Sequence, residues 1–226
     1  MYKRQTQGGS NSAVVIADAY VKGLEGIDFE EALEAMIKDA TVPPGGTEEQ
    51  EGRGGLKDYN KIGYVSQNFH RGGTRTVEYA YNDFNIATVA KGLGKPEIAT
   101  RYYDQANNWQ NLWRDISNNG STGFIMPRNA DGSWVDTVNC DLNDAPRESI
   151  EYHPLARDWP RCVCWWCGFL YEASSWEYSL YVPHDVTSLV VKSGGTVAFR
   201  RRLDTLFDSH FYNVGKEHCL LYTSDA

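Results

Sequence analysis

Apolar side chains recur with a helical period along most of this chain, and the segments that carry them fall into pairs. A helix capped by Ser10 or Asn11 is expected to run to about Gly23, and it is apolar on nearly every side, as buried helices are. The next segment, 29–40, carries its apolar residues on one stripe and its charges elsewhere. Asp28, with Glu31 three residues later, predicts where this second, outward-facing helix begins.

The same pattern returns after a glycine-rich, charged loop that is expected to last until about Gly73. Apolar residues keep a helical period from 77 to 90, and a glycine pair at 92 and 94 ends the segment. Pro96 suits the first turn of the following helix. That helix is expected to continue through Trp113 and Ile116 until the turn residues 118–120.

A third pair follows near the end of the chain. One segment runs from Trp176 to about Lys192, with an interruption at Pro183, and the other runs from Val197 to Phe207. Three buried-then-amphipathic pairs predict a mainly α fold, an α/α toroid whose inner helices surround a cavity. Since six pairs close such a ring, three helical hairpins correspond to half of an (α/α)6 barrel.

Residues 117–171 form an insertion between the second and third pairs. Connections of this length are usually functional or disordered. The segments 124–127 and 131–135 are typical of a β-hairpin with an Asp-Gly turn. In a toroid such an insertion would cover one mouth of the cavity, where a site is built.

Four of the five cysteines lie in this insertion, and the fifth is Cys219. The pair Cys164 and Cys167 has the spacing of half a zinc site or of a redox pair, but a zinc site needs two more ligands at suitable spacing. Disulfides of a secreted protein, free buried thiols and a metal site all remain open, and disulfides are favoured. A signal peptide is not visible in the residues given, since the basic residues 1–5 are followed by no apolar region.

Composition narrows the range of partners. The 226 residues carry a net charge of −8 with a sequence pI of about 5.1, which argues against a nucleic-acid partner. No apolar stretch approaches the roughly 18 residues that a membrane span requires, so no membrane partner is expected. Aromatic residues make up 13%, with seven Trp and fourteen Tyr, and they suit either a carbohydrate cleft or a large helical core.

Candidate chemistry is concentrated in residues 171–185, where acids, a histidine and aromatic rings lie close together. Taken singly, Glu172 could be an acid at a helix start, Asp185 a helix cap and His184 a satisfied polar residue. Together they suggest sugar binding, because sugar rings stack on aromatics while acids bind the hydroxyls. Glycoside hydrolysis requires a pair of carboxyl groups, one of which is kept protonated.

Four long motifs occur in order and resemble glycoside hydrolase family 92, most closely its fungal members. They are GGSNSAVVIADAYVKG (8–23), RTVEYAYNDF (75–84), GFIMPR (123–128) and YEASSWEYSLYVPHD (171–185). The resemblance implies a calcium-dependent, inverting exo-α-mannosidase that often acts on α-1,2 bonds. It also implies an N-terminal β-sandwich followed by an (α/α)6 barrel, with the site between them.

The resemblance assigns roles to individual residues. Glu172 matches the general acid, and Glu217 lies in a segment that contributes to sugar and calcium binding. The preceding Lys216 replaces the usual Asn and cannot bind Ca2+. Three further residues match positions that shape the mannose subsite: Trp176, Glu177 and Asp185.

The resemblance covers residues 6–218, which we expect to be a partial catalytic domain. Residues 1–5 and 219–226 continue no family pattern and are expected to be foreign to it. The β-sandwich and the paired aspartates that serve as general base would lie outside the chain. The parent is therefore expected to be a secreted enzyme acting on mannose-terminated glycans, and the fragment itself to be inactive.

Two other classes of function remain open from the sequence. One is a different α/α-toroid hydrolase, such as a glucoamylase-type enzyme, in which the base would lie on another loop. The other is a non-catalytic helical scaffold, in which the segment 172–185 would be buried away from any cavity mouth.

Overall fold

The computed structural model describes residues 11–44, 52–140, 148–151, 154, 168–171 and 173–208, and these are mainly helical. The order of elements is α1 (Ser12–Val21), α2 (Phe29–Thr41), α3 (Leu56–Ile62), α4 (Gly72–Gly92), α5 (Pro96–Gln105), the 3-10 helix η1 (Ala106–Leu112), β1 (Trp113–Asn118), β2 (Ser121–Ile125), β3 (Thr137–Cys140), β4 (Glu148–Glu151), α6 (Ser175–Tyr178), α7 (Val186–Lys192) and α8 (Thr196–Leu206).

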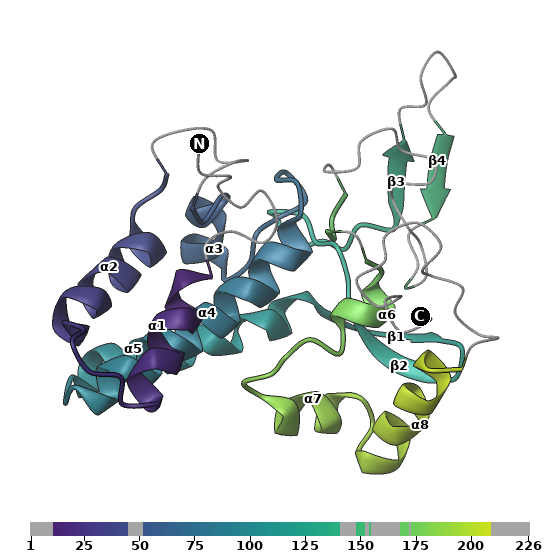
Figure 1. Ribbon diagram of the computed structural model, residues 1–226. Helices are drawn as coiled ribbons and strands as arrows, with labels where there is room; N and C mark the ends of the chain where they lie inside the picture. The colour runs from purple at the N-terminus through teal and green to yellow at the C-terminus, as the bar shows by residue number, and fades with distance from the viewer. Residues whose placement is uncertain are drawn as a thin grey trace, which may run out of the picture.

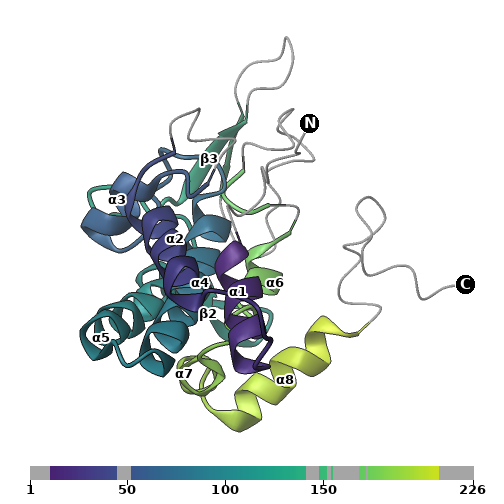
Figure 2. The ribbon, with the colours of Figure 1, turned by 60° about the vertical axis from the view of Figure 1, so that its left-hand side comes forward.

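Helix α4 runs through the middle of the helical group, with α1, α2 and α5 around it (Figures 1 and 2). Most of its residues are buried, as the inner helix of a pair should be. Its second half packs with one core cluster, to which Ala17, Leu33 and Tyr102 contribute from the three neighbouring helices. The mainly α class that the periodicity predicts is confirmed.

The β1–β2 hairpin packs with α6 and α8 (Figure 1), and a second core forms there, to which Leu189 of α7 also belongs. Trp109, Phe124 and Trp176 are completely buried there. Arg202 of α8 is also buried, with its guanidinium 4.2 Å from the centre of the Phe124 ring, and Nη1 donates to the Gly123 carbonyl at 2.7 Å. Burial lowers the pKa of Arg202 to about 10.

The expected helix starts are found, with one difference in detail. The Asp28 carboxylate caps α2 by accepting from the N–H groups of Glu30 and Glu31, and Pro96 occupies the first turn of α5. Asn11 stands at the N-cap position of α1, but its side chain makes no cap hydrogen bond. Its Oδ1 instead accepts from Nδ2 of Asn82 at 2.9 Å, which ties α1 to α4.

Two expectations about helix boundaries are wrong. The segment expected to be a loop up to Gly73 contains α3, and α4 begins five residues before the apolar period does. The helix expected to continue to 118 ends at Gln105, passes through η1 and becomes β1. Residues 113–118 are extended because they pair with β2, from Trp113 with Ile125 to Asn118 with Ser121.

The hairpin expected around the Asp-Gly turn is only partly present. A single bridge between Arg128 and Trp134 closes that turn, whereas the regular hairpin is β1–β2. Its turn residues Asn119 and Gly120 both have positive φ, 48° and 75°, as the tight turn between two twisted strands requires. A further antiparallel pair, β3–β4, extends away from the helical group (Figure 1).

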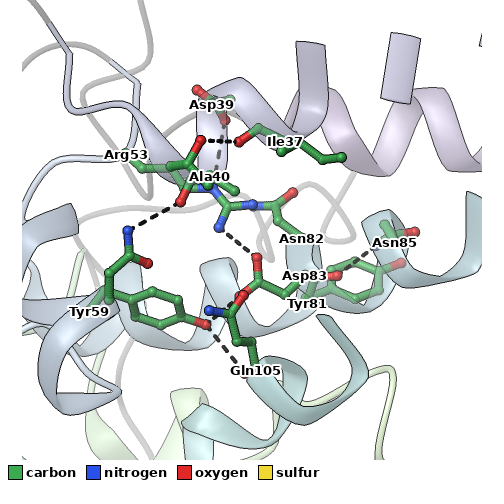
Figure 3. Close-up of polar contacts among 12 residues, drawn as sticks. Ile37, Asp39, Ala40, Arg53, Tyr59, Tyr81, Asn82, Asp83, Asn85 and Gln105 are labelled. Atoms are coloured by element: carbon green, nitrogen blue, oxygen red, sulfur yellow. Dashed lines mark hydrogen bonds and ion pairs between the residues drawn. The ribbon is translucent and has the colours of Figure 1, made fainter. Parts of the chain in front are cut away.

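A buried ion pair joins the segment before α3 to α4. Nη1 of Arg53 lies 2.6 Å from Oδ1 of Asp83, and the hydroxyl of Tyr59 donates to Oδ2 of Asp83 at 2.8 Å (Figure 3). Asp39 of α2 lies 3.7 Å from Nε of Arg53. Three elements are therefore connected at one point, on the face of α4 that Asp83 occupies.

The exposed side of α1 departs from the expectation of a fully buried helix. Ala13 and Ala17 are buried, whereas Val15 and Val21 are each 71% exposed. Val14, Val15 and Val21 line a groove of about 410 Å³ together with Tyr81 and Phe84 of α4. Within the described ranges, no helix is both long and apolar enough to cross a bilayer.

Candidate functional site

The segment before position 172 is attached to the first turn of α4. The N–H groups of Arg71 and Gly73 donate to the carbonyls of Gly168 and Phe169, at 2.7 and 3.0 Å. The N–H of Tyr171 donates to Oγ1 of Thr74 at 2.8 Å. The first amides of a helix have no partners within it, so α4 offers donors that this segment satisfies.

The close approach of the segment depends on a glycine. A Cβ atom at Gly73 would lie 2.4 Å from Cε1 of Phe169 and 2.7 Å from Cδ2 of Leu170. Both contacts are shorter than side chains tolerate, and both neighbours are buried in the core. Any side chain at this position would therefore push the segment away from α4.

Helix α6 begins at Ser175 with a capping box, in which Ser174 is the N-cap residue. Oε2 of Glu177 accepts from the N–H and the hydroxyl of Ser174, at 2.7 and 3.1 Å. The hydroxyl of Tyr178 donates to the Tyr171 carbonyl at 3.1 Å, so α6 also holds the segment that precedes it. Glu177 therefore has a structural role in addition to its predicted role in sugar binding.

A pocket of about 280 Å³ opens where α4 and α6 meet. Its lining residues are Glu78, Ala173, Glu177, Tyr178 and Tyr181. Two carboxylates and two phenols around one cavity provide the acceptors and donors that a polyhydroxylated ligand requires. The pocket lies beside position 172, because Ala173 forms part of its wall.

Glu78 is the member of this pocket that the sequence reasoning missed. It lies half-buried on α4, and its Oε2 accepts from the hydroxyl of Tyr181 at 3.5 Å. Burial raises the pKa of Glu78, while hydrogen bonds from Asn11 and Tyr181 oppose that rise. The available signal was the motif 75–84 itself, in which Glu78 is the first acid on an otherwise buried helix.

Trp176 occupies the core and is completely buried. Its Nε1 donates to Oδ1 of Asn118 at 2.8 Å, and its ring centre lies 5.3 Å from that of Phe124. Its ring belongs to the core cluster that anchors α6, and it is not among the residues that line the pocket. A role in shaping the mannose subsite stays a prediction for this residue.

Asp185 and His184 follow at the start of α7. The Asp185 carboxylate accepts from the N–H of Ser188 at 3.2 Å and so caps α7, while its role in the mannose subsite stays a prediction. The His184 ring is stacked on Tyr81, with Nε2 2.9 Å from the Ala106 carbonyl. Burial lowers the pKa of His184, against opposing contributions from Ala106 and Asp185.

Several sequence-predicted residues lie outside the described part of the chain. They are Glu172, Lys216, Glu217 and the four cysteines Cys162, Cys164, Cys167 and Cys219. Within the described ranges, no group of three or more His, Cys, Asp or Glu side chains could hold a metal ion. The roles predicted for Glu172 and Glu217, and the choice among disulfides, thiols and metal, stay predictions.

A model of the glycosyl hydrolase family 92 catalytic domain matches residues 1–222. The chain belongs to glycosyl hydrolase family 92. The resemblance carried by the four motifs is thus confirmed. The boundaries expected at residues 5 and 219 stay predictions, because both ends lie outside the described residues.

Comparison with individual relatives agrees with this family 92 assignment. The chain is 38% identical over 237 aligned positions to an uncharacterized secreted glycosidase of Arthroderma benhamiae, covering 96% of this chain and 29% of the relative. An inverting family 92 mannosidase of Bacteroides thetaiotaomicron matches with a TM-score of 0.72 and 32% identity, over 88% of this chain and 23% of that one.

A second family 92 α-mannosidase of the same bacterium, solved in complex with mannoimidazole, matches with a TM-score of 0.68 and 29% identity. The match covers 88% of this chain and 22% of that one. The family 92 chain described here therefore spans less than a third of the length of these relatives.

Proposed function

We propose that this chain is part of the catalytic domain of a calcium-dependent, inverting exo-α-mannosidase. Its substrates are mannose-terminated N-glycans or mannans, with α-1,2 bonds as the preferred linkage. The observation that carries the proposal is the acidic pocket beside position 172 in a chain of family 92. Solved relatives with 32% and 29% identity, described as mannosidases, support the substrate class.

Glu172 acts as the general acid in this proposal. An inverting glycosidase protonates the leaving oxygen with one carboxyl group, while a second activates a water from the opposite face, roughly 6.5–9.5 Å away. The N–H of the preceding residue, Tyr171, donates to Thr74, and the following residue, Ala173, forms part of the pocket wall, so both neighbours of position 172 support a place for the acid beside the pocket. The general base would come from the rest of the enzyme.

Calcium is part of the proposal because the family resemblance implies calcium dependence and places Glu217 in a segment that contributes to calcium binding. The described residues do not themselves form a calcium site, since the carboxylates of Glu177 and Asp185 already serve as helix caps. Ca2+ takes six to eight oxygen ligands, most of which would lie beyond this chain. When bound, the ion would supply a charge that grips sugar hydroxyls. Full activity of the complete enzyme after exhaustive chelation would contradict this part of the proposal.

Secretion is proposed for the parent enzyme. The cysteine-containing insertion suits an oxidising compartment, and the Arthroderma benhamiae relative is described as secreted.

The decisive experiment replaces the acid in the complete enzyme. Glu172→Gln keeps the shape of the side chain but removes the transferable proton, so hydrolysis of an α-1,2-mannobiose should fall by about 10²–10⁴-fold. An aryl mannoside whose phenol leaves without protonation should lose much less. The matched control is Glu34→Gln, an exposed acid of α2, which should behave as the wild type on both substrates. Equal losses on the two substrates would show that Glu172 is only a helix-start acid.

A further inference from the structure

The face of α4 that meets the pocket carries Thr74 and Glu78 four residues apart. Residues at this spacing are neighbours on one side of a helix. Thr74 binds the N–H of Tyr171 at 2.8 Å, and Ala173 lines the pocket together with Glu78. The chain on both sides of position 172 therefore passes over the helix face that presents Glu78.

Glu78 keeps acceptor positions that a ligand in the pocket can use. It accepts from Asn11 and Tyr181, and the Tyr181 hydroxyl lies 3.5 Å from Oε2, at the outer limit of a hydrogen bond. Oε2 of Glu177, by contrast, accepts two hydrogen bonds from Ser174, at 2.7 and 3.1 Å, in the capping box of its own helix. A carboxylate has about four acceptor positions, so Glu78 can accept further hydroxyl donors from a ligand in the cavity.

Asp83, another acid of α4, has the partners expected of a carboxylate whose role is structural. Asp83 is fully buried, and it is paired with Arg53 at 2.6 Å and with the Tyr59 hydroxyl at 2.8 Å (Figure 3). Five residues separate it from Glu78, so the two side chains leave the helix about 140° apart. Asp83 faces the Arg53 segment, whereas Glu78 faces the pocket.

Glu78 has no such cation beside it among the described residues. Within the described part of the chain, the groups that oppose the rise in its pKa are the neutral side chains of Asn11 and Tyr181. Burying a carboxylate without a cation costs free energy, and such groups are concentrated at binding and catalytic sites. The burial of Glu78 is therefore more readily explained by a ligand than by stability.

We infer that Glu78 binds a hydroxyl group of the mannosyl unit whose bond is cleaved, with Tyr181 orienting its carboxylate. The inference rests on the proposed function, since it takes a sugar as the occupant of the pocket. Glu78 is thus a substrate-binding residue distinct from the proposed acid Glu172. It holds the sugar from the α4 side, while α6 forms the adjoining wall.

The test measures binding of mannoimidazole to the complete enzyme by calorimetry, together with melting of each variant and hydrolysis of α-1,2-mannobiose. Glu78→Gln keeps the volume of the side chain but removes its charge. Loss of a charge-assisted hydrogen bond should weaken mannoimidazole binding about 10- to 100-fold and raise KM for the mannobiose. The melting temperature should stay within about 3 °C of the wild type, because no cation loses its partner. Glu34→Gln should bind as the wild type.

The outcomes separate this inference from the proposed function. Wild-type enzyme without binding or hydrolysis of mannosides contradicts the proposed function itself. An active wild type with Glu78→Gln binding mannoimidazole within twofold of it overturns the inference alone. Tyr181→Phe is included to test whether a loss of affinity only reflects a loss of stability. If both Glu78→Gln and Tyr181→Phe lose affinity only in proportion to a fall in melting temperature, Glu78 supports the fold and the inference is wrong.

Discussion

The hydroxyl oxygen of Thr74 accepts a hydrogen bond from the backbone N–H of Tyr171 at 2.8 Å, across 97 positions of sequence. The hydroxyl of Tyr178 of α6 donates to the carbonyl of the same Tyr171 at 3.1 Å. Helices α4 and α6 therefore both hold the residue that precedes position 172. This relationship makes α4 the part of the fold on which the proposed acid depends.

Replacing Thr74 by valine in the complete enzyme should disturb catalysis through geometry. The change preserves shape but leaves the Tyr171 N–H without its acceptor, at a cost of about 1–3 kcal/mol. Displacement of the neighbouring segment by an ångström is enough to lower kcat by about 10²-fold. Steady-state kinetics on mannobiose checks this result. The control Thr100→Val, at an exposed position of α5, should leave kcat unchanged; equal kinetics for the two variants would show that Thr74 does not position the segment.

Breaking the buried ion pair should strongly destabilise the complete enzyme. Asp83→Asn removes the charge that faces Arg53, whose side chain is only 1% exposed, and an uncompensated buried charge costs about 3–5 kcal/mol. The apparent midpoint of urea unfolding should fall accordingly. The double variant Arg53→Met with Asp83→Leu should recover part of the loss, because it removes both charges of the buried pair and leaves only the partly exposed Asp39 without its neighbour. This account would be contradicted if the double variant lost more free energy of unfolding than Arg53→Met and Asp83→Leu lose together.

Acidification should weaken the packing around His184. Its pKa in the folded state lies below the unfolded value, because burial disfavours the charged ring and outweighs Ala106, Asp185 and Asp83. The unfolded chain therefore binds the proton at higher pH than the folded protein does. The stabilisation is complete above the unfolded pKa near 6.5 and is lost as the pH falls from there toward the folded pKa.

The predicted contribution is at most about 1.4 kcal/mol per pH unit in that window. Urea unfolding of the complete enzyme between pH 7.5 and 5 should show a shallower pH dependence for His184→Asn than for the wild type. His70→Asn, an exposed position, serves as control and should keep the wild-type slope. Identical slopes for all three proteins would exclude His184 as a source of acid sensitivity.

The 226-residue chain expressed alone should aggregate, bind hydrophobic dyes and fail to hydrolyse mannobiose. Val15 and Val21 are each 71% exposed, Val191 is 69% exposed and Val197 76%. Val15 and Val21 line one groove with Tyr81 and Phe84, and contiguous apolar surface is uncommon on soluble monomers. Light scattering, dye fluorescence and an activity assay check the expectation. A monodisperse monomer with a cooperative melt and measurable mannosidase activity would prove it wrong.

The sequence located the helices well where a local signal marked them. Asp28 and Pro96 act on the backbone within one turn, so α2 and α5 begin where these residues predict. The motif 171–185 also indicated the region in which the pocket lies, although its members separate in space. Glu177 reaches the pocket, whereas Trp176 lies in the core and Asp185 caps α7.

Residues 113–118 show where prediction of secondary structure from the local sequence pattern fails. Their apolar positions fit a helix as well as a strand, and the strand forms because Ser121–Ile125 can pair with it across the Asn119-Gly120 turn. Long-range pairing of this kind leaves little trace in the period of a single segment. The same applies to α3, whose short apolar pattern is stabilised by contacts of Leu56 and Tyr59 with α4.

The sequence by itself determined the family and the helical class, because motifs, caps and periodicity act over a few residues. Only the tertiary structure decided which acids share a cavity. Glu78 and Glu177 are 99 positions apart in sequence, and they line one pocket because the anchoring of Tyr171 on Thr74 brings α6 against α4. The same structure assigned Asp83 to an ion pair and Glu78 to the pocket, since 140° around a helix places them in different surroundings.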